Sequence, residues 1–365
     1  MNNHNTDQKG AIVVTIFDNL YDKIVDYNNI KNAYEQVLKF GRRYKRDAIQ
    51  FSLKEDLNLV ALWQELKNGT YQISPYIRFK VYEPKERWVS APAFRDKIVQ
   101  FATHTALKEV YKNVFIQNSF ACIDGRGTHS AVDKVQKNMR IANRLFDDAW
   151  IVKFDVSKFF YSIDRTILKT ILRKKISCTK TLWLLDNVID SSPEGQAGIP
   201  LGNVTSQLFA NVYLNELDQY CQRFLKVRYY VRYMDDVVAI VDTKEHAQKL
   251  LKEMKMFVKK RLNIEANPKK SQIFPLKQGV NAYGYKIWTT HRLVRNQSKK
   301  AMKRKMKGLD RKLKNGEVSI EKVNQIAMSW LGHARHSNSY NLSKKIFAKY
   351  PYIKFEGGPY FGNRR

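Results

Sequence analysis

Three aspartates of this chain stand where a strand is expected to end or to turn. Asp155 closes an apolar run that begins at Trp150, and Asp235 and Asp236 lie next to each other between two β-rich runs. Carboxylates that converge from neighbouring strands repel one another unless cations neutralise them, and Mg²⁺ prefers carboxylate oxygens together with substrate phosphates. Two such ions about 3.5–4 Å apart can hold the attacking and leaving oxygens of a phosphoryl transfer. The three aspartates therefore predict a two-metal site.

A simple turn is the alternative for Asp235 and Asp236, because aspartate is a common turn residue. The flanking segments 227–233 and 237–241 are expected to be strands, so the two residues fall at the tip of a hairpin. For an isolated Asp-Asp pair the turn is the better interpretation. The motifs around this pair, described below, favour the metal site.

The elements that must position these aspartates alternate between strands and helices. A strand, a helix, a hairpin, a second helix and further strands follow in order, which is typical of an α+β fold with helices on one face of a mostly antiparallel sheet. The helices are predicted from apolar residues at helical spacing, and the strands are predicted from β-branched and aromatic runs. The expected helices are 31–40, 94–111, 204–224 and 244–262, and the expected strands are 150–155, 227–233, 237–241, 271–274 and 282–288.

The composition points to a polyanionic partner. Among 365 residues, 65 are Lys or Arg and 34 are Asp or Glu, which gives a net charge of +31 and a pI of about 9.9. So large a charge repels itself unless a polyanion neutralises it, which argues against an ordinary small-metabolite enzyme. The 44% hydrophobic and 12% aromatic residues argue against disorder. The chain is therefore expected to be a folded, nucleic-acid-binding protein of about two domains.

A basic segment near the C-terminus is the strongest candidate for the phosphate-binding surface. Residues 292–314 contain eleven Lys or Arg and one acid, Asp310, and apolar residues interleave with them at near-helical spacing. A solvated helix face is the alternative interpretation of such a charge run. In a chain of this charge, a folded basic helix that contacts the phosphate backbone is favoured. The residues expected to bind nucleic acid there are Lys303, Arg304, Lys305 and Lys307.

Neither cysteines nor histidines indicate a metal or disulfide framework. Cys122, Cys178 and Cys221 are far apart, which fits a reducing compartment. His333 and His336 lie three residues apart, and packing or contact with RNA is favoured over metal binding. The apolar run 11–17 is too short for a membrane span and has the wrong flanks for a signal peptide. A soluble, cytoplasmic protein with no membrane partner is expected.

Two motifs resemble those of reverse transcriptases. The string Tyr233-Met234-Asp235-Asp236 is similar to the signature hairpin of that family, and the segment 154–160 (FDVSKFF) resembles its first catalytic motif. The resemblance covers about residues 74–340. It implies a right-hand polymerase with an N-terminal extension (1–44), fingers (45–149), palm (150–290) and thumb (291–365). It also implies an RNA-directed DNA polymerase whose partners are template RNA, the RNA/DNA hybrid and dNTPs.

The same resemblance implies the metal ligands and the catalytic residues. The ligands of two Mg²⁺ ions, which Mn²⁺ can replace, would be Asp155, Val156, Asp235 and Asp236. Asn267-Pro268-Lys269-Lys270-Ser271 resembles the loop whose lysine protonates the leaving pyrophosphate, and Lys270 is the closer match. The segment that contains Tyr283, Gly284 and Tyr285 looks like the hairpin that grips the primer end, where glycine lets backbone approach backbone.

Further residues match the nucleotide-binding positions of the family. Lys85 and Arg87 would bind the incoming triphosphate. Lysine binds phosphate as a point charge, and arginine binds it through a planar fork of N–H donors. The alternative is that both residues are exposed bases without a role. Phe160 would pack under the sugar and exclude a 2′-OH, so deoxynucleotides are the expected substrate. A core phenylalanine is the alternative for Phe160, and Phe159 competes with it for the pocket. Val156, Leu201 and Gln207 complete the expected dNTP-binding set.

A subgroup is indicated by the segment 198–207 (GIPLGNVTSQ). Most reverse transcriptases carry Gln-Gly-x-x-x-Ser-Pro there, whereas this chain has Leu201-Gly202 followed by Ser206-Gln207. That pattern, with the segments 119–121, 127–129 and 329–334, resembles reverse transcriptases of diversity-generating retroelements. The resemblance implies copying of a template-repeat RNA with errors opposite adenine, aided by a small basic accessory variability protein. Physically, Leu201 lacks the polar contact that a glutamine could make, and discrimination built on polar contacts falls without them.

Two other functions stay open at this point. A retron-type or phage-defence reverse transcriptase would use the same chemistry, and a non-catalytic RNA-binding scaffold would have lost it. The intact aspartates, together with Lys85 and Arg87, argue against the scaffold. Group II intron proteins carry further domains after the thumb, for which this chain is expected to have no room.

Overall fold

The computed structural model describes residues 15–39, 42–82, 86–192 and 197–353. The chain forms two compact units and passes between them several times. The first unit comprises Met1–Ile116, Val156–Tyr220 and Met256–Glu265, and the second comprises Gln117–Asp155, Cys221–Lys255 and Ala266–Arg365. The division into fingers, palm and thumb stays a prediction.

The first unit is mostly helical and is built around α5 (Phe94–Tyr111), which packs against α2 and α10. The α5 residues Ile98, Val99, Ala102 and Leu107 are fully or almost fully buried, so the apolar period of this segment follows its contacts. Two antiparallel strands, β1 and β2, form a ribbon in this unit. Its other elements are α1 (Leu20–Ile24), α2 (Tyr27–Leu38), η1 (Arg42–Tyr44), α3 (Arg46–Ser52), α4 (Glu55–Asn68), β1 (Ile77–Val81), β2 (Arg87–Ala91), α7 (Phe159–Ser162), α8 (Arg165–Arg173), α9 (Thr179–Asp190) and α10 (Val204–Gln219).

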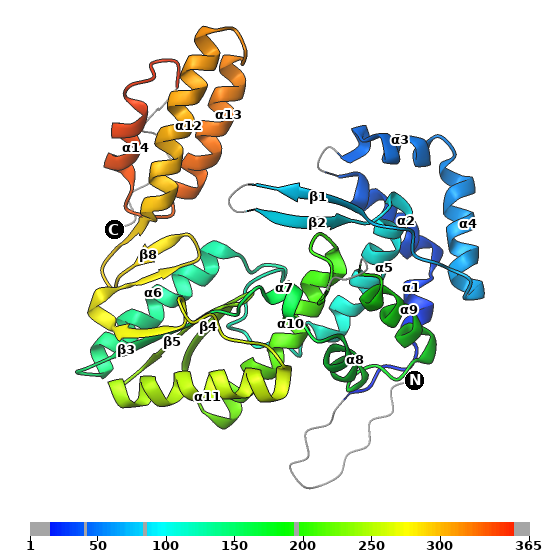
Figure 1. The fold of residues 1–365 in the computed structure, drawn as a ribbon, viewed down its shortest axis with the longest axis horizontal. Helices are drawn as coiled ribbons and strands as arrows, with labels where there is room; N and C mark the ends of the chain where they lie inside the picture. Colours follow the sequence, from blue (N-terminus) through cyan, green and yellow to red (C-terminus); the bar gives the residue numbers. More distant parts are fainter. Residues whose placement is uncertain (1–14, 40–41, 83–85, 193–196, 354–365) are drawn as a thin grey trace. The chain divides into compact units, whose positions relative to one another are not determined.

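The second unit holds a four-stranded antiparallel sheet with the order β4-β5-β3-β6. In Figure 1, α6 and α11 are drawn on either side of this sheet. Because the central strands β3 and β5 are buried on both faces, their sequences are apolar except for Lys153 in β3 and Asp236 at the start of β5. The elements are α6 (Thr128–Leu145), β3 (Trp150–Phe154), the π-helical turn η2 (Tyr220–Phe224, whose first residue belongs to the first unit), β4 (Tyr229–Tyr233), β5 (Asp236–Val241), α11 (Lys244–Leu262, whose last turns belong to the first unit) and β6 (Gln272–Pro275).

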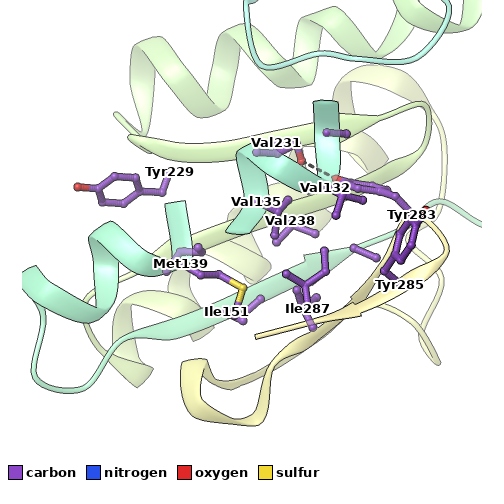
Figure 2. Packing of buried hydrophobic residues seen from close by; sticks show 14 of the residues in the cluster. Val132, Val135, Met139, Ile151, Tyr229, Val231, Val238, Tyr283, Tyr285 and Ile287 are labelled. Carbon is purple, nitrogen blue, oxygen red and sulfur yellow. Dashed lines mark hydrogen bonds between the residues drawn. The ribbon is translucent and has the colours of Figure 1, made fainter. Parts of the chain in front are cut away.

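A small second sheet, β7-β8-β9, packs against the same core. Figure 2 shows this core, in which Val132, Val135 and Met139 of α6 meet Ile151 and Val238 of the larger sheet. Tyr285 and Ile287 extend the cluster into the small sheet. After η3 (Leu276–Gln278), the three strands are β7 (Val280–Ala282), β8 (Tyr285–Ile287) and β9 (Arg292–Val294).

Three C-terminal helices form a separate hydrophobic cluster in the second unit. Met302 and Met306 of α12 pack with Val323, Ala327 and Leu331 of α13. The helices are α12 (Asn296–Lys314), α13 (Ile320–Ala334) and α14 (Tyr340–Phe347). Among the helices in the described part of the chain, none combines the length and apolar composition needed to cross a bilayer.

Most of the predicted elements are confirmed, and the α+β class with an antiparallel sheet is correct. The helices predicted over 94–111 and 244–262 match α5 and α11 to the residue. The helix predicted over 204–224 is confirmed: α10 ends at Gln219 and continues directly as a π-helical turn to Phe224. The single helix expected between Asp155 and the hairpin is wrong, because α7, α8 and α9 precede α10.

Two further predictions differ from the structure where the chain turns. The strand predicted over 282–288 is two strands, β7 and β8, because Tyr283 and Gly284 both take a positive φ and reverse the chain. The basic helix predicted from Arg292 begins at Asn296, since residues 292–294 pair with β8 as β9. The helix predicted over 31–40 begins earlier, at Tyr27, where the Asp26 side chain accepts a hydrogen bond from the Asn29 amide as an N-cap.

Candidate active site

Asp155 lies at the end of β3, where its backbone is held from two sides. The Ser271 hydroxyl is 3.2 Å from the Asp155 amide nitrogen and 3.1 Å from its carbonyl oxygen, and the Asn267 amide donates to the same carbonyl at 2.7 Å. Asp155 is 4% exposed. The loop 267–271 therefore fixes the position of this carboxylate within the second unit.

Asp235 and Asp236 lie where β4 turns into β5, as the sequence predicts. Tyr233 pairs with Asp236, so the loop between the strands has two residues, and Met234 takes a left-handed φ of 55°. The fully buried Arg232 donates from a guanidinium nitrogen to the Met234 carbonyl at 3.0 Å. This contact supports a backbone conformation that non-glycine residues seldom adopt.

Two lysines form ion pairs with two of the three carboxylates. The Lys270 ammonium is 2.9 Å and 2.7 Å from the two carboxylate oxygens of Asp155. Lys153, two residues before Asp155 on β3, forms an ion pair with Asp236. Lys153 is 9% exposed, whereas Lys270 is exposed to solvent.

The electrostatics of the site show how closely these charges interact. Burial and the neighbouring charge of Asp155 raise the pKa of Asp235, while Lys270 and Lys153 oppose that shift. Burial and the positive charge of Arg295 lower the pKa of Lys153. A cation at Asp235 and Asp155 would relieve the repulsion between them.

A cavity of about 900 Å³ opens beside these side chains within the second unit. Its charged lining has five Lys or Arg side chains and two aspartates, so the excess charge is positive. It extends from the carboxylates across the small sheet to the first turn of α12. The lining residues are Lys153, Asp155, Asp236, Lys269, Lys270, Gln272, Phe274, Gln278, Gly279, Asn281, Lys286, Trp288, Leu293, Val294, Arg295, Asn296 and Gln297.

The aspartates suit Mg²⁺ in chemistry, because carboxylate oxygens are its preferred protein ligands. In the described residues, however, no group of three His, Cys, Asp or Glu side chains is arranged to hold a metal ion by itself. Asp155 and Asp236 are instead bound to lysines. Val156 follows Asp155 but belongs to the first unit, and the metal role of all four residues stays a prediction.

In the first unit, the glycine-rich segment 198–202 packs on two predicted nucleotide-binding elements. The Ile199 amide donates to the Phe160 carbonyl at 2.9 Å, and a Cβ at Gly198 would lie 2.1 Å from that same carbonyl oxygen. The Ser90 amide donates to the Leu201 carbonyl at 3.1 Å. Only glycine fits at position 198, so this contact between the segment and Phe160 depends on it.

Phe160 is more exposed than its competitor. Phe159 is 3% exposed and packs in the core, whereas Phe160 is half-buried. The two rings contact each other with centroids 5.7 Å apart. Phe160 is therefore the more accessible of the two rings, and its place under the sugar stays a prediction.

Gln207 is exposed on the first turn of α10 and lines a second cavity, of about 460 Å³, in the first unit. Arg42, Lys45 and Lys97 bring positive charge to this cavity, and Asp47, which pairs with Lys97, offsets part of it. None of these four charged residues was predicted to bind nucleotide. Arg87 begins β2, opposite Val81, and only its backbone is described. Lys85 lies outside the described residues.

The hairpin that contains Tyr283, Gly284 and Tyr285 is present, but both tyrosines are buried. Tyr283 is 7% exposed and Tyr285 is fully buried, so neither ring presents itself to a nucleic-acid strand. Their hydroxyl groups bind other protein groups: that of Tyr283 contacts the backbone of β4 and β5, and that of Tyr285 contacts His333. Contact between this hairpin and a primer would therefore use its backbone.

The predicted nucleic-acid residues of α12 are all exposed. Lys303, Arg304, Lys305 and Lys307 face solvent, while Met302 and Met306 are buried beneath them. A groove on this helix is lined by Asn296, Gln297, Lys300, Lys303 and Arg304. Of the four predicted residues, Lys303 and Arg304 line this groove, whereas Lys305 and Lys307 do not. Lys300 also lines it and was not predicted.

The histidines near the C-terminus pack against α6 and the small sheet. His336 stacks on His129 of α6 with ring centroids 3.5 Å apart. The Tyr285 hydroxyl is 3.0 Å from Nδ1 of His333 and 3.3 Å from Nδ1 of His129. Burial lowers the pKa of both His129 and His333, which favours the neutral form. These contacts agree with the packing role favoured from the sequence.

Several residues of the site were not predicted. Lys153 and Arg232 carry a usable signal, because each is a charged residue inside an otherwise apolar strand. Ser271 and Arg295 carry none. The hydrogen bond of Ser271 to Asp155 and the electrostatic effect of Arg295 on Lys153 depend on segments that meet only in the fold.

Comparison with known proteins identifies the family to which this sequence is similar. Residues 80–332 match the family described as reverse transcriptase (RNA-dependent DNA polymerase). Protein YkfC of Escherichia coli (strain K12) is 28% identical, and the match covers 67% of this chain and 73% of YkfC. The group II intron-encoded protein LtrA of Lactococcus lactis subsp. cremoris is 24% identical over 67% of this chain and 52% of its own length.

A solved structure of telomerase from Candida albicans, in complex with a TWJ fragment of telomeric RNA, is 11% identical. It aligns over 78% of this chain and 56% of that chain with a TM-score of 0.47. The chain thus spans about half the length of LtrA and of this telomerase. The family match covers more than half of the chain and, with the antiparallel α+β fold, confirms the predicted right-hand polymerase class. This chain belongs to the reverse transcriptase family and is by class an RNA-dependent DNA polymerase.

Proposed function

We propose that this chain copies a template-repeat RNA into cDNA with frequent errors opposite adenine, as reverse transcriptases of diversity-generating retroelements do. The observation that carries the proposal is Leu201 before Gly202, with Ser206 and Gln207 after it. Leu201 is half-buried and its carbonyl accepts a hydrogen bond from Ser90 of β2. An apolar side chain thus stands at the position where most of the family has a glutamine.

The catalytic roles follow from the carboxylates of the second unit. Asp155, Asp235 and Asp236, with the Val156 carbonyl, would hold two Mg²⁺ ions, which supply charge neutralisation for the attacking and leaving oxygens. Lys270 would give a proton to the leaving pyrophosphate from its place beside Asp155. The positive lining of the cavity attracts the phosphates of the substrates.

The substrates and partners complete the proposal. Template RNA, the RNA/DNA hybrid and dNTPs would bind the basic surfaces, with Lys85 and Arg87 on the triphosphate. A small basic accessory variability protein is a further expected partner. Retron-type and intron-type enzymes share the polymerase chemistry, so the error spectrum separates them from this proposal.

The error spectrum should change when Leu201 is replaced by glutamine. A polar side chain there can bond to the nascent base pair, so we expect errors opposite template adenine to fall about tenfold, which corresponds to about 1.4 kcal/mol of added discrimination. The measurement is sequencing of cDNA made on one defined RNA, with errors scored separately opposite A, C, G and U.

Leu201→Met is the matched control, because it keeps an apolar side chain of similar volume. It should preserve the parent's error spectrum. Equal adenine errors in the parent and in Leu201→Gln would show that the errors do not come from this position. A parent with no excess of errors opposite adenine would favour a retron-type or intron-type enzyme.

Replacing Phe160 by alanine should admit ribonucleotides, since it removes the ring expected under the 2′ position. We expect the preference for dNTPs over rNTPs to fall by about tenfold to a hundredfold, the range for removal of a steric barrier of about 1–3 kcal/mol. The ratio of kcat/KM for the two nucleotide classes measures this. Phe160→Tyr keeps the ring and should keep the preference, whereas an unchanged ratio in Phe160→Ala would place the sugar elsewhere.

A further inference from the structure

Tyr283 contacts the catalytic hairpin from a different sheet. Its hydroxyl lies 3.1 Å from the Val231 carbonyl oxygen on β4 and 3.2 Å from the Asp236 carbonyl oxygen on β5. The bond to Val231 is drawn in Figure 2. The two carbonyls belong to the two strands that carry Asp235 at their turn, so one hydroxyl group spans the base of that turn.

The ring of Tyr283 makes a second connection to the same site. The Lys153 ammonium lies 5.6 Å from the centroid of this ring, within the range of a cation–π contact. Lys153 is also the ion-pair partner of Asp236. The Tyr233 ring, next to the turn, lies 5.5 Å from that of Tyr283. The Tyr283 side chain therefore contacts three parts of this site. These are the Asp236 carbonyl, Lys153, which pairs with Asp236, and Tyr233, which lies next to the turn.

The position of Tyr283 is itself closely determined. Ala282 pairs with Tyr285, and the two residues between them have φ values of 50° and 92°, as in a type I′ turn. Tyrosine seldom adopts such a φ, so the surrounding contacts must hold it there.

The α13 helix supplies one of those contacts. A Cβ at Gly284 would lie 3.0 Å from Cε1 of His333. The Tyr285 ring stacks on His333 with centroids 4.4 Å apart, and its hydroxyl reaches the His333 carbonyl at 2.8 Å. The turn is therefore packed directly between α13 and the catalytic hairpin.

We propose that Tyr283 is a positioning residue that holds the Asp235–Asp236 hairpin in its metal-binding shape through the Val231 and Asp236 carbonyls. The proposal rests on the metal-dependent DNA synthesis proposed above. Tyr283 touches no reacting atom. It acts on the backbone that orients the carboxylates, so its removal alters metal binding before it alters contact with RNA.

Tyr283→Phe tests the proposal, because it removes the hydroxyl and keeps the ring. In single-turnover incorporation at saturating dNTP, we expect the Mg²⁺ concentration for half-maximal rate to rise about threefold or more. Direct Mn²⁺ binding to the enzyme on a template–primer, followed by electron paramagnetic resonance, should weaken by a similar factor. The affinity for the template–primer and the midpoint of thermal unfolding should stay near those of the parent.

Tyr213→Phe is the matched control. The Tyr213 hydroxyl is also buried and also donates to a backbone carbonyl, that of Leu262, in the other unit. It should leave both metal measurements unchanged. An unchanged Mn²⁺ affinity in Tyr283→Phe, or an equal weakening in Tyr213→Phe, would overturn the proposal.

Failure of the proposed function gives a different result. If the parent makes no DNA but Tyr283→Phe still weakens Mn²⁺ binding selectively, the synthesis proposal fails and the positioning role stands. If the parent binds no Mn²⁺ on any template–primer, the metal-binding shape itself is wrong and the positioning role fails with it.

Discussion

Asp235→Asn should reduce primer extension by about a thousandfold or more, equivalent to about 4 kcal/mol of transition-state stabilisation. Asparagine has the same shape but lacks the negative charge that a divalent cation requires. Asp235 lies in the turn between β4 and β5, and its charge interacts with that of Asp155. Removal of one carboxylate should therefore weaken metal binding while the rest of the hairpin stays in place.

The measurement is extension of a DNA primer on an RNA template by the purified variant, with RNA affinity determined in parallel. RNA binding should stay largely intact, because Lys and Arg side chains, not this carboxylate, are expected to hold the phosphates. Asp242→Asn is the control, since Asp242 is an exposed aspartate beyond the far end of β5 that pairs with His246. Near-normal extension by Asp235→Asn would remove the catalytic assignment.

Replacing Lys303, Arg304 and Lys307 together by glutamine should weaken template–primer binding and flatten its salt dependence. Neutralising one side chain that binds a phosphate reduces the slope of log K against log salt by roughly 0.7–0.9, so the three should reduce it by about 2–3. The affinity relative to the parent would then change by roughly a hundredfold to a thousandfold across each tenfold range of salt. Binding isotherms at several salt concentrations measure both quantities.

Replacement of Lys322, Lys344 and Lys345 together by glutamine is the matched control. These are exposed lysines on α13 and α14, outside the predicted binding set, and their replacement removes the same total charge. The control should leave the slope nearly unchanged. An unchanged slope in the variant of Lys303, Arg304 and Lys307 would mean that this face of α12 is only solvated.

Local sequence patterns were sufficient for the elements that carry the carboxylates. The apolar run before Asp155 predicted β3, and the two β-rich runs around Asp235 and Asp236 predicted their hairpin. The helical period predicted α5 and α11 with correct ends. These succeed because one face or both faces of each element are buried, so burial imposes a regular spacing on the chain. The two short motifs within these elements also identified the family.

The turns were the weaker part of the prediction. The residues 282–288 alternate as one strand would, yet Tyr283 adopts a φ of 50° and the chain reverses there. Glycine at 284 permits a positive φ, but it does not require one. The positive φ values of this turn are stabilised by packing against His333, which lies on a helix and is 49 residues after Gly284 in the chain.

The sequence by itself determined the family, the antiparallel sheet and the placement of three aspartates at strand ends. Only the tertiary structure decided which groups surround them: Lys270 on Asp155, Lys153 on Asp236, and the Tyr283 hydroxyl beneath their hairpin. The physical reason is that burial repeats along an element and leaves a period in the sequence. An ion pair or a hydroxyl contact between residues more than 40 positions apart leaves no such period, because it depends on how separate elements pack.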